Sequence, residues 1–428
     1  MATRNKPKLI GLADCNNFFV SCERSIRPEL NGRPVVVLSN NDGCIVSRSN
    51  EAKAMQIPMG APLFKWQGFF EKNGVAVISG NHELYGRISR RVMAVLAEYT
   101  DTVEQYSIDE AFFNLAIASI DDHAGYCEGI RRAVLEKCGI PVSIGISTSK
   151  TLCKLGSEMA KARCMKDASA SPVCVLLAED AYPIYPRLSP ADVWGVGRRT
   201  AQALRAIGIT TVADMLSMDE RTIRRMASIR LVQTVRELRG IPEFPLCGEE
   251  EKQKSMMVSS SFGKRLTDYS DIKVALIKHA YDGARKLRSA GLKARVVGVT
   301  LRTSRFISAV YANSAKVEMD PPASQDGEII AAALRCLEEI YRPGIEYAKT
   351  GIFFDGLEDG DCRQLTMFDL DPQREKKERQ MKSIDELNAK FGKRTIFPAV
   401  IKDTSAVDPQ HRWRSAVPTD AQEPADEA

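Results

Sequence analysis

The stretch VEQYSIDEAFFNL, residues 103–115, contains two short runs that are typical of β-strands, Val103–Tyr106 and Ala111–Leu115. The connection between these runs ends in two adjacent acids, Asp109 and Glu110. Two strands this close in sequence pair most simply as an antiparallel hairpin. The stretch therefore predicts a hairpin that holds two neighbouring carboxylates at its turn.

A first strand is predicted at Lys8–Ala13, an apolar run that Asp14 follows directly. Further patterned segments predict helices and strands around the hairpin, namely a helix across Ile88–Tyr99, a helix at Tyr126–Lys137, a strand at Pro141–Ser147, a helix at about Lys150–Ala162 and a strand at Val173–Leu177. This β…αββαβ order predicts a split-βαβ sheet covered by helices on one side. The first strand and the central hairpin are neighbours in such a sheet, so Asp14 can meet Asp109 and Glu110.

The rest of the chain predicts additional domains of mixed α/β type. A hairpin signal lies at 34–47 around Asn40–Gly43, and prolines between 183 and 190 mark a boundary before a helical, glycine-punctuated region. After a charged linker at Glu249–Lys254, strands alternate with helices at about Ile272–Arg288 and Asp326–Ile340. The pattern fades after Leu357; Asp371–Met381 is a charge run, and the polar stretch from Val407 onward is expected to be disordered.

Length and composition favour a multidomain cytosolic protein. The chain has 428 residues, of which 44% are hydrophobic and 27% charged, and it contains no apolar run of the roughly 20 residues that a membrane helix needs. The basic start, Met1–Lys8, leads into too short an apolar stretch for a signal peptide. The 11 cysteines show neither CxxC nor Cys/His ligand spacing, which argues against a zinc site or a disulfide framework.

Positive charge is concentrated in the middle of the chain, although the net charge is only +5. Between Lys252 and Lys316 there are 14 Lys and Arg against 3 Asp and Glu. Between Arg187 and Glu243 there are 10 against 6. These regions suggest binding to a phosphate backbone, and two ordinary solvated surfaces are the equal alternative.

Three converging carboxylates are what a two-metal phosphoryl-transfer site requires, because the two ions lie about 3.5–4 Å apart and prefer oxygen ligands. Asp14, Asp109 and Glu110 are the candidate ligands. A loop cap and a solvated turn are the alternative, and the acids alone would favour that alternative.

Longer motifs decide in favour of the catalytic interpretation. The segments DCNNFFVSCE at 14–23 and YSIDEA at 106–111 resemble the two catalytic motifs of the Y-family translesion DNA polymerases. Three further segments resemble the UmuC type, the catalytic subunits of bacterial DNA polymerase V, and these are PVVVLSNNDGC at 34–44, DVWGVGRR at 192–199 and VRELRG at 235–240. The resemblance extends to about Arg394 and is specific.

This resemblance implies a right-hand polymerase of mixed α/β (α+β) class. The implied domains are a split-βαβ palm (1–24 and 81–178), small fingers (25–80), a helical thumb with a helix-hairpin-helix (179–243), an α/β little finger (252–357) and a C-terminal tail (358–428). It also implies two Mg²⁺ ions held by Asp14, Asp109, Glu110 and the backbone carbonyl of Cys15.

Further roles follow from the resemblance for the nucleotide. Phe18 and Phe19 match nucleotide-contacting positions, with Phe19 as the steric gate that excludes a sugar 2′-hydroxyl. A core position is the alternative for Phe19 and for Phe18. Relatives often carry Tyr at the gate. Ser47, Lys53 and Lys161 match positions near the triphosphate, and Lys53 stands where relatives often carry Arg.

A P-loop is excluded at Gly145–Thr151, because this stretch is one residue short of GxxxxGK[ST] and lacks the second glycine before Lys150. Val193–Gly197 instead resembles the turn of a helix-hairpin-helix. Gly195, Gly197 and Arg198 are the candidate contacts to a DNA phosphate there, with a plain interhelix turn as the alternative.

The hexapeptide QLTMFD at 364–369 resembles the short peptide by which bacterial polymerases bind the sliding clamp, the β subunit. Its candidate contact residues are Gln364, Leu365, Met367 and Phe368.

The function that these motifs predict is error-prone translesion synthesis, in which the primer 3′-hydroxyl attacks a dNTP on primed template DNA. A catalytically silent DNA-binding scaffold that recruits the clamp, and a nucleotide cyclase on the same kind of sheet, are the alternatives. By resemblance, the further partners are two processed UmuD-type subunits and a RecA filament. The expected location is cytoplasmic and nucleoid-associated, with no membrane contact.

Overall fold

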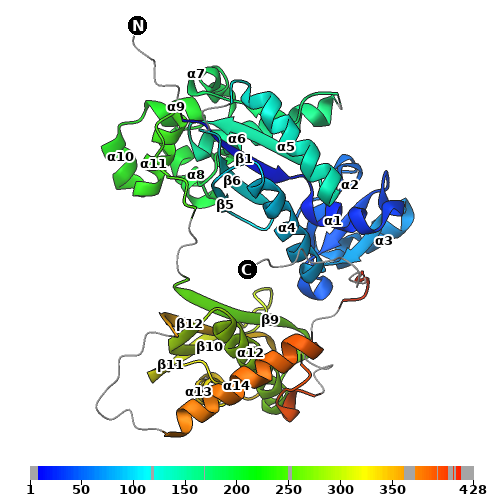
Figure 1. Ribbon diagram of the computed structural model, residues 1–428, viewed down its shortest axis with the longest axis vertical. Helices are drawn as coiled ribbons and strands as arrows, with labels where there is room; N and C mark the ends of the chain where they lie inside the picture. The colour runs from blue at the N-terminus through cyan, green and yellow to red at the C-terminus, as the bar shows by residue number, and fades with distance from the viewer. Residues whose placement is uncertain are drawn as a thin grey trace. The chain divides into compact units, whose positions relative to one another are not determined.

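A computed structural model describes residues 8–116, 120–167, 169–248, 253–360, 372–392, 394–402, 408 and 411–415 (Figure 1). The chain divides into two compact units. The first comprises Met1–Leu38, Cys44–Glu250 and Trp413–Ala428, and the second comprises Ser39–Gly43 and Glu251–Arg412. Within the described residues, no helix is both long enough and apolar enough to cross a membrane.

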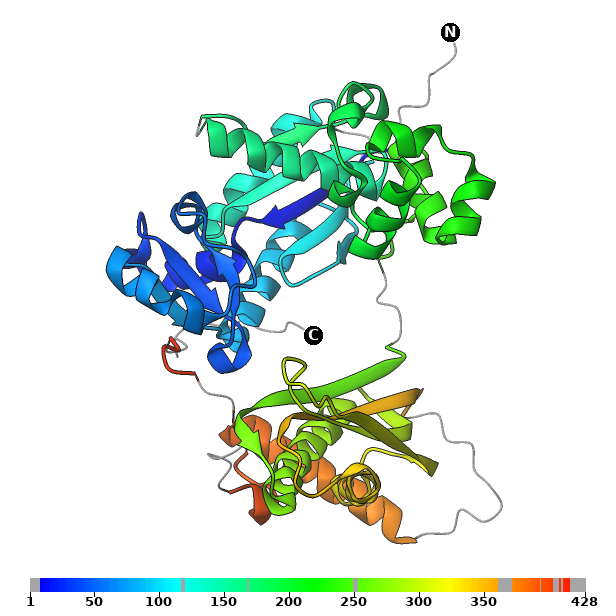
Figure 2. The ribbon, with the colours of Figure 1, turned by 180° about the vertical axis from the view of Figure 1, so that it is seen from behind.

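The central sheet of the first unit has the strand order β5-β6-β1-β7-β8 (Figure 2). Its strands are β1 (Ile10–Cys15), β5 (Val103–Gln105), β6 (Glu110–Asn114), β7 (Val142–Ser147) and β8 (Val173–Val175). β1 pairs antiparallel with both β6 and β7, and β5 pairs antiparallel with β6. The first strand therefore lies beside the acidic hairpin, which confirms the predicted split-βαβ arrangement.

Helices cover both faces of this sheet, whereas the sequence predicted helices on one side only. Helices α4 (His82–Ala97) and α5 (His123–Cys138) share one apolar core with Ala13, Phe113 and Ile144. Helix α6 (Lys150–Lys166) packs on the opposite face, where its Cys153 meets Leu12 and Phe112. The prediction was wrong because β1, β6 and β7 have buried residues on both faces, and each face therefore needs a cover.

Glycine 145 lets α6 approach the sheet at close range. A Cβ atom at this position of β7 would stand 1.9 Å from the carbonyl oxygen of Cys153 and 2.5 Å from the amide nitrogen of Ser157, both in the backbone of α6. Only glycine fits between strand and helix here. The distance between α6 and the sheet matters for function, because α6 carries the two lysines that reach Asp14.

A smaller sheet of order β3-β2-β4 forms the predicted fingers region. Its elements are β2 (Val35–Leu38), β3 (Ile45–Arg48), β4 (Ala76–Ser79), α2 (Asn50–Ala54), α3 (Leu63–Asn73) and the 3-10 helix Pro28–Leu30. The 3-10 helix Asn40–Asp42, which follows β2 in the chain, belongs to the second unit. The antiparallel pairing of β2 with β3 confirms the predicted hairpin. Helix α1 (Phe18–Ile26) leads into this region from β1.

Short helices follow β8 and pack against α6. They are α7 (Ala178–Ala181), the 3-10 helices Tyr185–Arg187 and Pro190–Asp192, α8 (Arg198–Ala206), α9 (Val212–Ser217), α10 (Glu220–Met226) and α11 (Ile229–Leu238). The buried carboxylate of Glu237 in α11 accepts hydrogen bonds from the backbone and hydroxyl of Thr151 at 2.8 and 2.7 Å, and from the backbones of Glu243 and Phe244. This carboxylate ties the start of α6 to the predicted thumb.

The second unit contains a sheet of order β11-β10-β12-β9 with helices on one face. Its elements are β9 (Ser255–Leu266), α12 (Tyr269–Ser289), β10 (Leu292–Arg302), β11 (Ala312–Ala323), α13 (Asp326–Ile340), β12 (Tyr347–Asp359), α14 (Pro372–Phe391) and the 3-10 helix Ala399–Ile401. The helices predicted near 272–288 and at 326–340 are both present.

The predicted tail from residue 358 onward contains regular structure, which differs from the sequence prediction. The α14 helix is held on α12 by Asp385, whose carboxylate pairs with Arg288 at 2.6 Å. Further along the chain, Ile401 packs on Tyr281 of α12. The charge run was misleading because its polar residues lie on a surface helix that is anchored by few contacts. The predicted clamp residues Gln364, Leu365, Met367 and Phe368 lie outside the described residues.

Replacing Gly145 with Ala should lower the free energy of unfolding of the first unit by about 1–3 kcal/mol, the usual cost of overpacking. Gly129→Ala is the matched control, since a Cβ at this exposed position of α5 meets nothing within 4 Å and alanine favours helices. Urea denaturation followed by circular dichroism measures both variants. Equal stability of Gly145→Ala and wild type would contradict the close packing of α6.

Candidate active site

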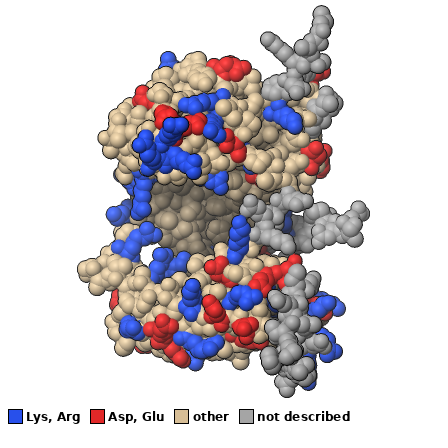
Figure 3. All heavy atoms as spheres, turned by 90° about the vertical axis from the view of Figure 1, so that its left-hand side faces the viewer, with Lys and Arg blue, Asp and Glu red and all other residues tan. Residues whose placement is uncertain are grey.

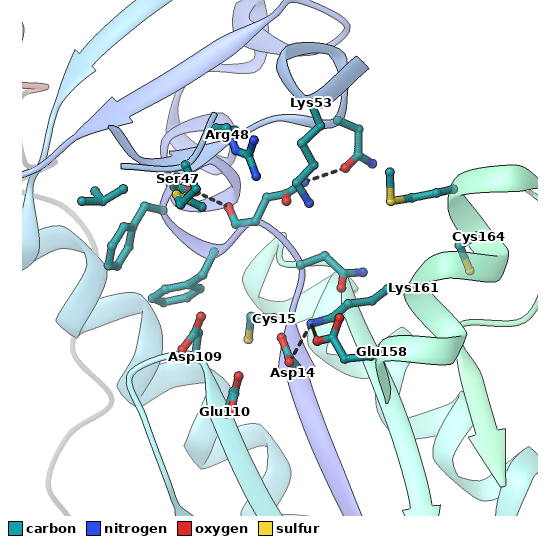
Figure 4. A pocket seen from close by; sticks show the side chains of 18 of the residues that line it. Asp14, Cys15, Ser47, Arg48, Lys53, Asp109, Glu110, Glu158, Lys161 and Cys164 are labelled. Carbon is teal, nitrogen blue, oxygen red and sulfur yellow. Dashed lines mark hydrogen bonds and ion pairs between the residues drawn. The ribbon is translucent and has the colours of Figure 1, made fainter. Parts of the chain in front are cut away.

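Asp14 and Glu110 face each other across the central sheet. They are direct partners in the antiparallel register of β1 and β6, and their side chains lie on the face that α6 covers. Asp109 precedes β6, and its carbonyl accepts a hydrogen bond from the Cys15 backbone at 2.9 Å. The sheet thus brings the three predicted acids together (Figure 4).

Two ammonium groups from α6 pair with these acids. The Lys154 ammonium is 2.8 Å from Asp14 and 2.5 Å from Glu110, and the Lys161 ammonium is 2.6 Å from Asp14. Glu158, on the same helix, pairs with Lys161 at 3.0 Å. Like charges placed opposite each other in a sheet destabilise it, so the lysines offset the repulsion between the carboxylates.

The two facing carboxyls have pKa values shifted in opposite directions. Burial alone would raise the pKa of Asp14, but the charges of Lys161 and Lys154 outweigh burial and lower it. Burial, together with the negative charge of Asp14, raises the pKa of Glu110 above its usual value. The pair therefore divides into a strongly ionised aspartate and a more easily protonated glutamate, a pattern that is frequent at functional sites.

The donor atoms at this place suit a hard divalent cation. Asp14, Asp109, Glu110 and the Cys15 carbonyl supply oxygen only, which matches the preference of Mg²⁺. In the described part of the chain, no group of three or more His, Cys, Asp and Glu side chains is arranged to hold a metal ion. The Lys154 ammonium bridges Asp14 and Glu110, and Ser107 donates a hydrogen bond to Asp109.

A cavity of about 360 Å³ opens beside the acids. Its far side is formed by Ser47, Arg48 and Lys53 of the fingers region (Figure 4). Burial and the charge of Arg48 lower the pKa of Lys53. A pocket with carboxylates at one end and cations at the other fits a ligand that carries phosphates next to metal ions.

Phe18 and Phe19 both line the same cavity; Phe19 is half-buried, whereas Phe18 is 3% exposed and also packs in the core of the first unit. The Phe19 ring stacks on Tyr85 of α4, with ring centroids 4.6 Å apart and planes 18° apart. Asn17, which precedes α1, has φ 49°, a left-handed conformation that turns the chain from β1 into the helix. This turn presents Phe19 beside the acids.

The predicted helix-hairpin-helix turn lies apart from the acids. Gly195 has φ +86°, which favours glycine, and Gly197 precedes α8, whose first turn begins with Arg198. No side chain among the described residues caps the start of α8. Trp194 connects this turn to the acidic hairpin, since its indole N–H donates to the Tyr106 hydroxyl at 3.2 Å.

Sequence reasoning missed Lys154, Arg48 and Glu158, which all line the cavity. Lys154 was within reach, because it lies seven residues before Lys161 and two helical turns place both side chains on one face. Arg48 follows Ser47 at the end of β3, a position that no periodicity marks.

The chain matches known proteins over most of its length. The impB/mucB/samB family matches residues 13–158, and the C-terminal domain of the same family matches residues 253–367. Protein UmuC of Salmonella typhimurium is 39% identical over 91% of this chain and 92% of its own length. The chain belongs to the impB/mucB/samB family of Y-family DNA polymerases.

Other members of the impB/mucB/samB family and more distant polymerases agree with this assignment. MucB of Escherichia coli is 37% identical over 91% of this chain and 92% of its own length. DNA polymerase IV of Dehalococcoides mccartyi is 26% identical over 89% of this chain and 94% of its own. A Y-family DNA polymerase chimera of Dbh and Dpo4 has the same fold, with a TM-score of 0.64 and 17% identity over 82% of this chain and 99% of that one.

Replacing Lys154 with Met should tighten the binding of a divalent cation at the acids, because Glu110 then loses its ammonium partner and Asp14 keeps only that of Lys161. The dissociation constant for Mn²⁺ at pH 8 should fall by about tenfold, which corresponds to about 1.4 kcal/mol. Lys166→Met, at an exposed position in the last turn of α6, is the control. Electron paramagnetic resonance of free Mn²⁺ measures both, and unchanged or weaker binding by Lys154→Met would show that the lysine does not compete.

Proposed function

We propose that the acidic site of this polymerase joins a dNTP to a primer 3′-hydroxyl with two Mg²⁺ ions, in error-prone synthesis past damaged template bases. The facing of Asp14 and Glu110 across β1 and β6, next to a cavity whose other end is cationic, is the observation that carries the proposal. A catalytically silent scaffold would have no need of facing carboxylates, of which Asp14 is buried and Glu110 half-buried, because such a pair costs stability.

The metal ions would be held by Asp14, Asp109, Glu110 and the Cys15 carbonyl. When bound, two such ions activate the attacking hydroxyl and stabilise the leaving pyrophosphate. The lowered pKa of Asp14 keeps this ligand ionised at neutral pH. Lys154 and Lys161 would leave the carboxylates for the triphosphate, whose charge offers them a new partner.

The cations around the cavity would bind the triphosphate. Lys53 and Lys161 would act as point charges near the β and γ phosphates, and the Ser47 hydroxyl would donate a hydrogen bond. We add Arg48 to these phosphate-binding residues because it lines the cavity. The planar guanidinium of Arg48 can donate two hydrogen bonds to one phosphate. Lys53 cannot do this, although it stands where relatives often carry Arg, so Arg48 would supply the bidentate contact.

Phe19 would select the sugar. Its ring lies in the cavity wall and is held from behind by Tyr85, so a ribose 2′-hydroxyl above it would meet a surface that cannot retreat. Phe18 is 3% exposed and supports the fold here more than it contacts a nucleotide.

DNA would be bound by backbone contacts on both units. Gly195, Gly197 and Arg198 present the uncapped start of α8 to a phosphate. In the second unit, Arg302 of β10 stands directly opposite Lys349 of β12, and the Arg302 charge contributes, after burial, to lowering the pKa of Lys349. Two cations opposite each other destabilise a sheet, so this pair suits a surface that faces a polyanion.

The concentration of positive charge in the second unit is smaller than the sequence count suggests. Several basic residues of the 252–316 window form ion pairs with acids beyond it, namely Arg265, Lys278, Arg288, Lys293 and Arg295. Lys and Arg side chains nevertheless lie on the face of each unit drawn in Figure 3. The contacts to DNA would therefore come from a part of the basic residues only.

Partner binding is the remaining part of the proposal. Gln364, Leu365, Met367 and Phe368 would bind the sliding clamp as an extended peptide. Processed UmuD-type subunits and a RecA filament would join the complex, in the manner of UmuC-type polymerases. Such a complex would work in the cytoplasm, on the nucleoid.

Asp109→Asn and Glu110→Gln should each lower primer extension by more than about 100-fold, since a metal ligand contributes several kcal/mol and each 1.36 kcal/mol is worth tenfold. DNA binding by fluorescence anisotropy should stay near wild type. Glu136→Gln, an exposed carboxylate of α5, is the matched control and should extend normally. Near wild-type extension by Asp109→Asn would contradict the catalytic assignment.

Phe19→Ala should lower the preference for dNTP over rNTP by at least about tenfold, because the ring no longer fills the space that a 2′-hydroxyl needs. Phe19→Tyr keeps the bulk and should keep the preference. Phe64→Ala removes a phenylalanine that is 77% exposed on α3 and serves as the control. Single-nucleotide insertion kinetics measure the ratio of kcat/KM values, and an unchanged ratio in Phe19→Ala would remove Phe19 from this role.

A further inference from the structure

The edge of the fingers sheet carries a short segment from near the end of the chain, Trp413–Ser415, which we call the clasp. β4 is an edge strand, and the clasp runs parallel to it through a bridge between Ser79 and Arg414. The Trp413 backbone N–H donates to the Ser79 hydroxyl at 2.9 Å, and the Ser79 N–H donates to the Trp413 carbonyl at 3.2 Å. The clasp thus covers an open sheet edge, as an added strand does.

The clasp also contacts the residue at which α4 begins. Asn81 is fully buried, and its amide donates to the Ser415 carbonyl at 3.1 Å and to the Ser415 hydroxyl at 3.3 Å. The carbonyl oxygen of the same side chain accepts from the Leu84 backbone in the first turn of α4 and from Arg414 at 3.2 Å. One buried amide therefore joins the clasp to the start of α4.

A second buried group joins the clasp to α1. Glu23 is 0% exposed, and its Oε1 accepts hydrogen bonds from the Tyr85 hydroxyl at 2.8 Å and from the Ser415 hydroxyl at 3.0 Å. Its Oε2 pairs with Arg27 at 2.9 Å. A buried carboxylate that loses a donor is costly, so Ser415 contributes to holding Glu23, and through it Tyr85, in place.

The clasp joins α1 and α4, the helices that carry the stacked rings of Phe19 and Tyr85. Phe19 lies one helical turn before Glu23 in α1, and Tyr85 lies one turn after Asn81 in α4. The stack of Phe19 on Tyr85 therefore depends on the spacing between α1 and α4. Glu23 fixes this spacing by accepting a hydrogen bond from the Tyr85 hydroxyl, and the Ser415 hydroxyl donates a second hydrogen bond to the same oxygen.

We propose that the clasp is a positioning element for sugar selection, in which the Ser415 hydroxyl, acting through Glu23 and Tyr85, sets the height of the Phe19 ring in the cavity. This inference rests on the proposed role of Phe19 as the gate. The clasp, including Ser415, is not part of the cavity lining; it acts through the buried side chains of Glu23 and Tyr85. Without the clasp, Tyr85 and Phe19 gain freedom, and a ribonucleotide fits more easily.

A purely structural role for the clasp predicts a different result. If the clasp only covers the edge of β4, its loss lowers the melting temperature and reduces dNTP and rNTP insertion in proportion. Under our proposal the ratio of the two kcat/KM values changes. This ratio therefore separates the two interpretations, because a smaller folded fraction cancels from it.

The test compares a chain ending at Arg412 with one ending at Ser415, which retains the clasp, in the reaction mixture that supports wild-type synthesis. The chain ending at Arg412 and the variant Ser415→Ala should lose about tenfold in preference for dNTP over rNTP, since small displacements of a positioning group are costly. The chain ending at Ser415 and the variant Ser415→Thr, which keeps the hydroxyl, should match wild type. If the shorter chain does not fold, the two Ser415 substitutions decide alone.

Phe19→Ala, measured in parallel, separates the two proposals. A wild-type ratio in Ser415→Ala, together with a lowered ratio in Phe19→Ala, would overturn the role of the clasp and leave the gate intact. A wild-type ratio in Phe19→Ala would instead overturn the gate and the clasp with it. A lowered ratio in both Ser415→Ala and Phe19→Ala, with Ser415→Thr unchanged, would support the clasp.

Discussion

The facing of Asp14 and Glu110 across β1 and β6 is the constraint on which the rest of the first unit depends. Two carboxylates in register repel each other, and the protein pays for this arrangement with cations from a single helix. That helix, α6, reaches them because Gly145 lets it lie almost against the sheet. The same helix is fixed at its start by the buried carboxylate of Glu237 and contributes Lys161 to the cavity beside the acids. Sheet register, helix packing and site electrostatics are therefore parts of one arrangement.

Each unit places two side chains of like charge directly opposite each other on neighbouring strands. In the first unit, the repulsion between Asp14 and Glu110 is offset by the Lys154 ammonium, which pairs with both carboxylates. In the second, Arg302 and Lys349 stand opposite each other on the sheet face that α12 and α13 do not cover. Neither pair stabilises the isolated chain, and each suits a ligand of opposite charge, metal ions at the first and a nucleic-acid backbone at the second. Each pair of like charges lowers the free energy of unfolding of the isolated chain, and binding of an oppositely charged ligand to the folded protein would offset that cost.

The sequence predicted that the first strand lies beside the acidic hairpin, that the acids of these strands can meet, and the helices that correspond to α4, α5, α6, α12 and α13, because hydrophobic periodicity is a strong local signal. It did not predict that α6 covers the second face of the sheet, since apolar residues on both faces of β1 do not show which helix covers which face. Lys154 was missed because a lysine on a helix is usually exposed, and only the tertiary fold directs this one toward Asp14 and Glu110. The helix α14 and the clasp were missed because each is held by a few long-range contacts, such as Arg288 with Asp385 and Glu23 with Ser415, which leave no periodic trace in the sequence.

The account is tested most directly by anomalous X-ray scattering from Mn²⁺ in crystals of the protein with primer-template DNA and a non-hydrolysable dNTP analogue. We expect two anomalous peaks about 3.5–4 Å apart, ligated by Asp14, Asp109 and Glu110, with the Lys154 ammonium moved away from the carboxylates. Peaks located elsewhere, or Lys154 still paired with Asp14 and Glu110 while the nucleotide is bound, would contradict the central claim that this carboxylate pair holds the catalytic metal ions.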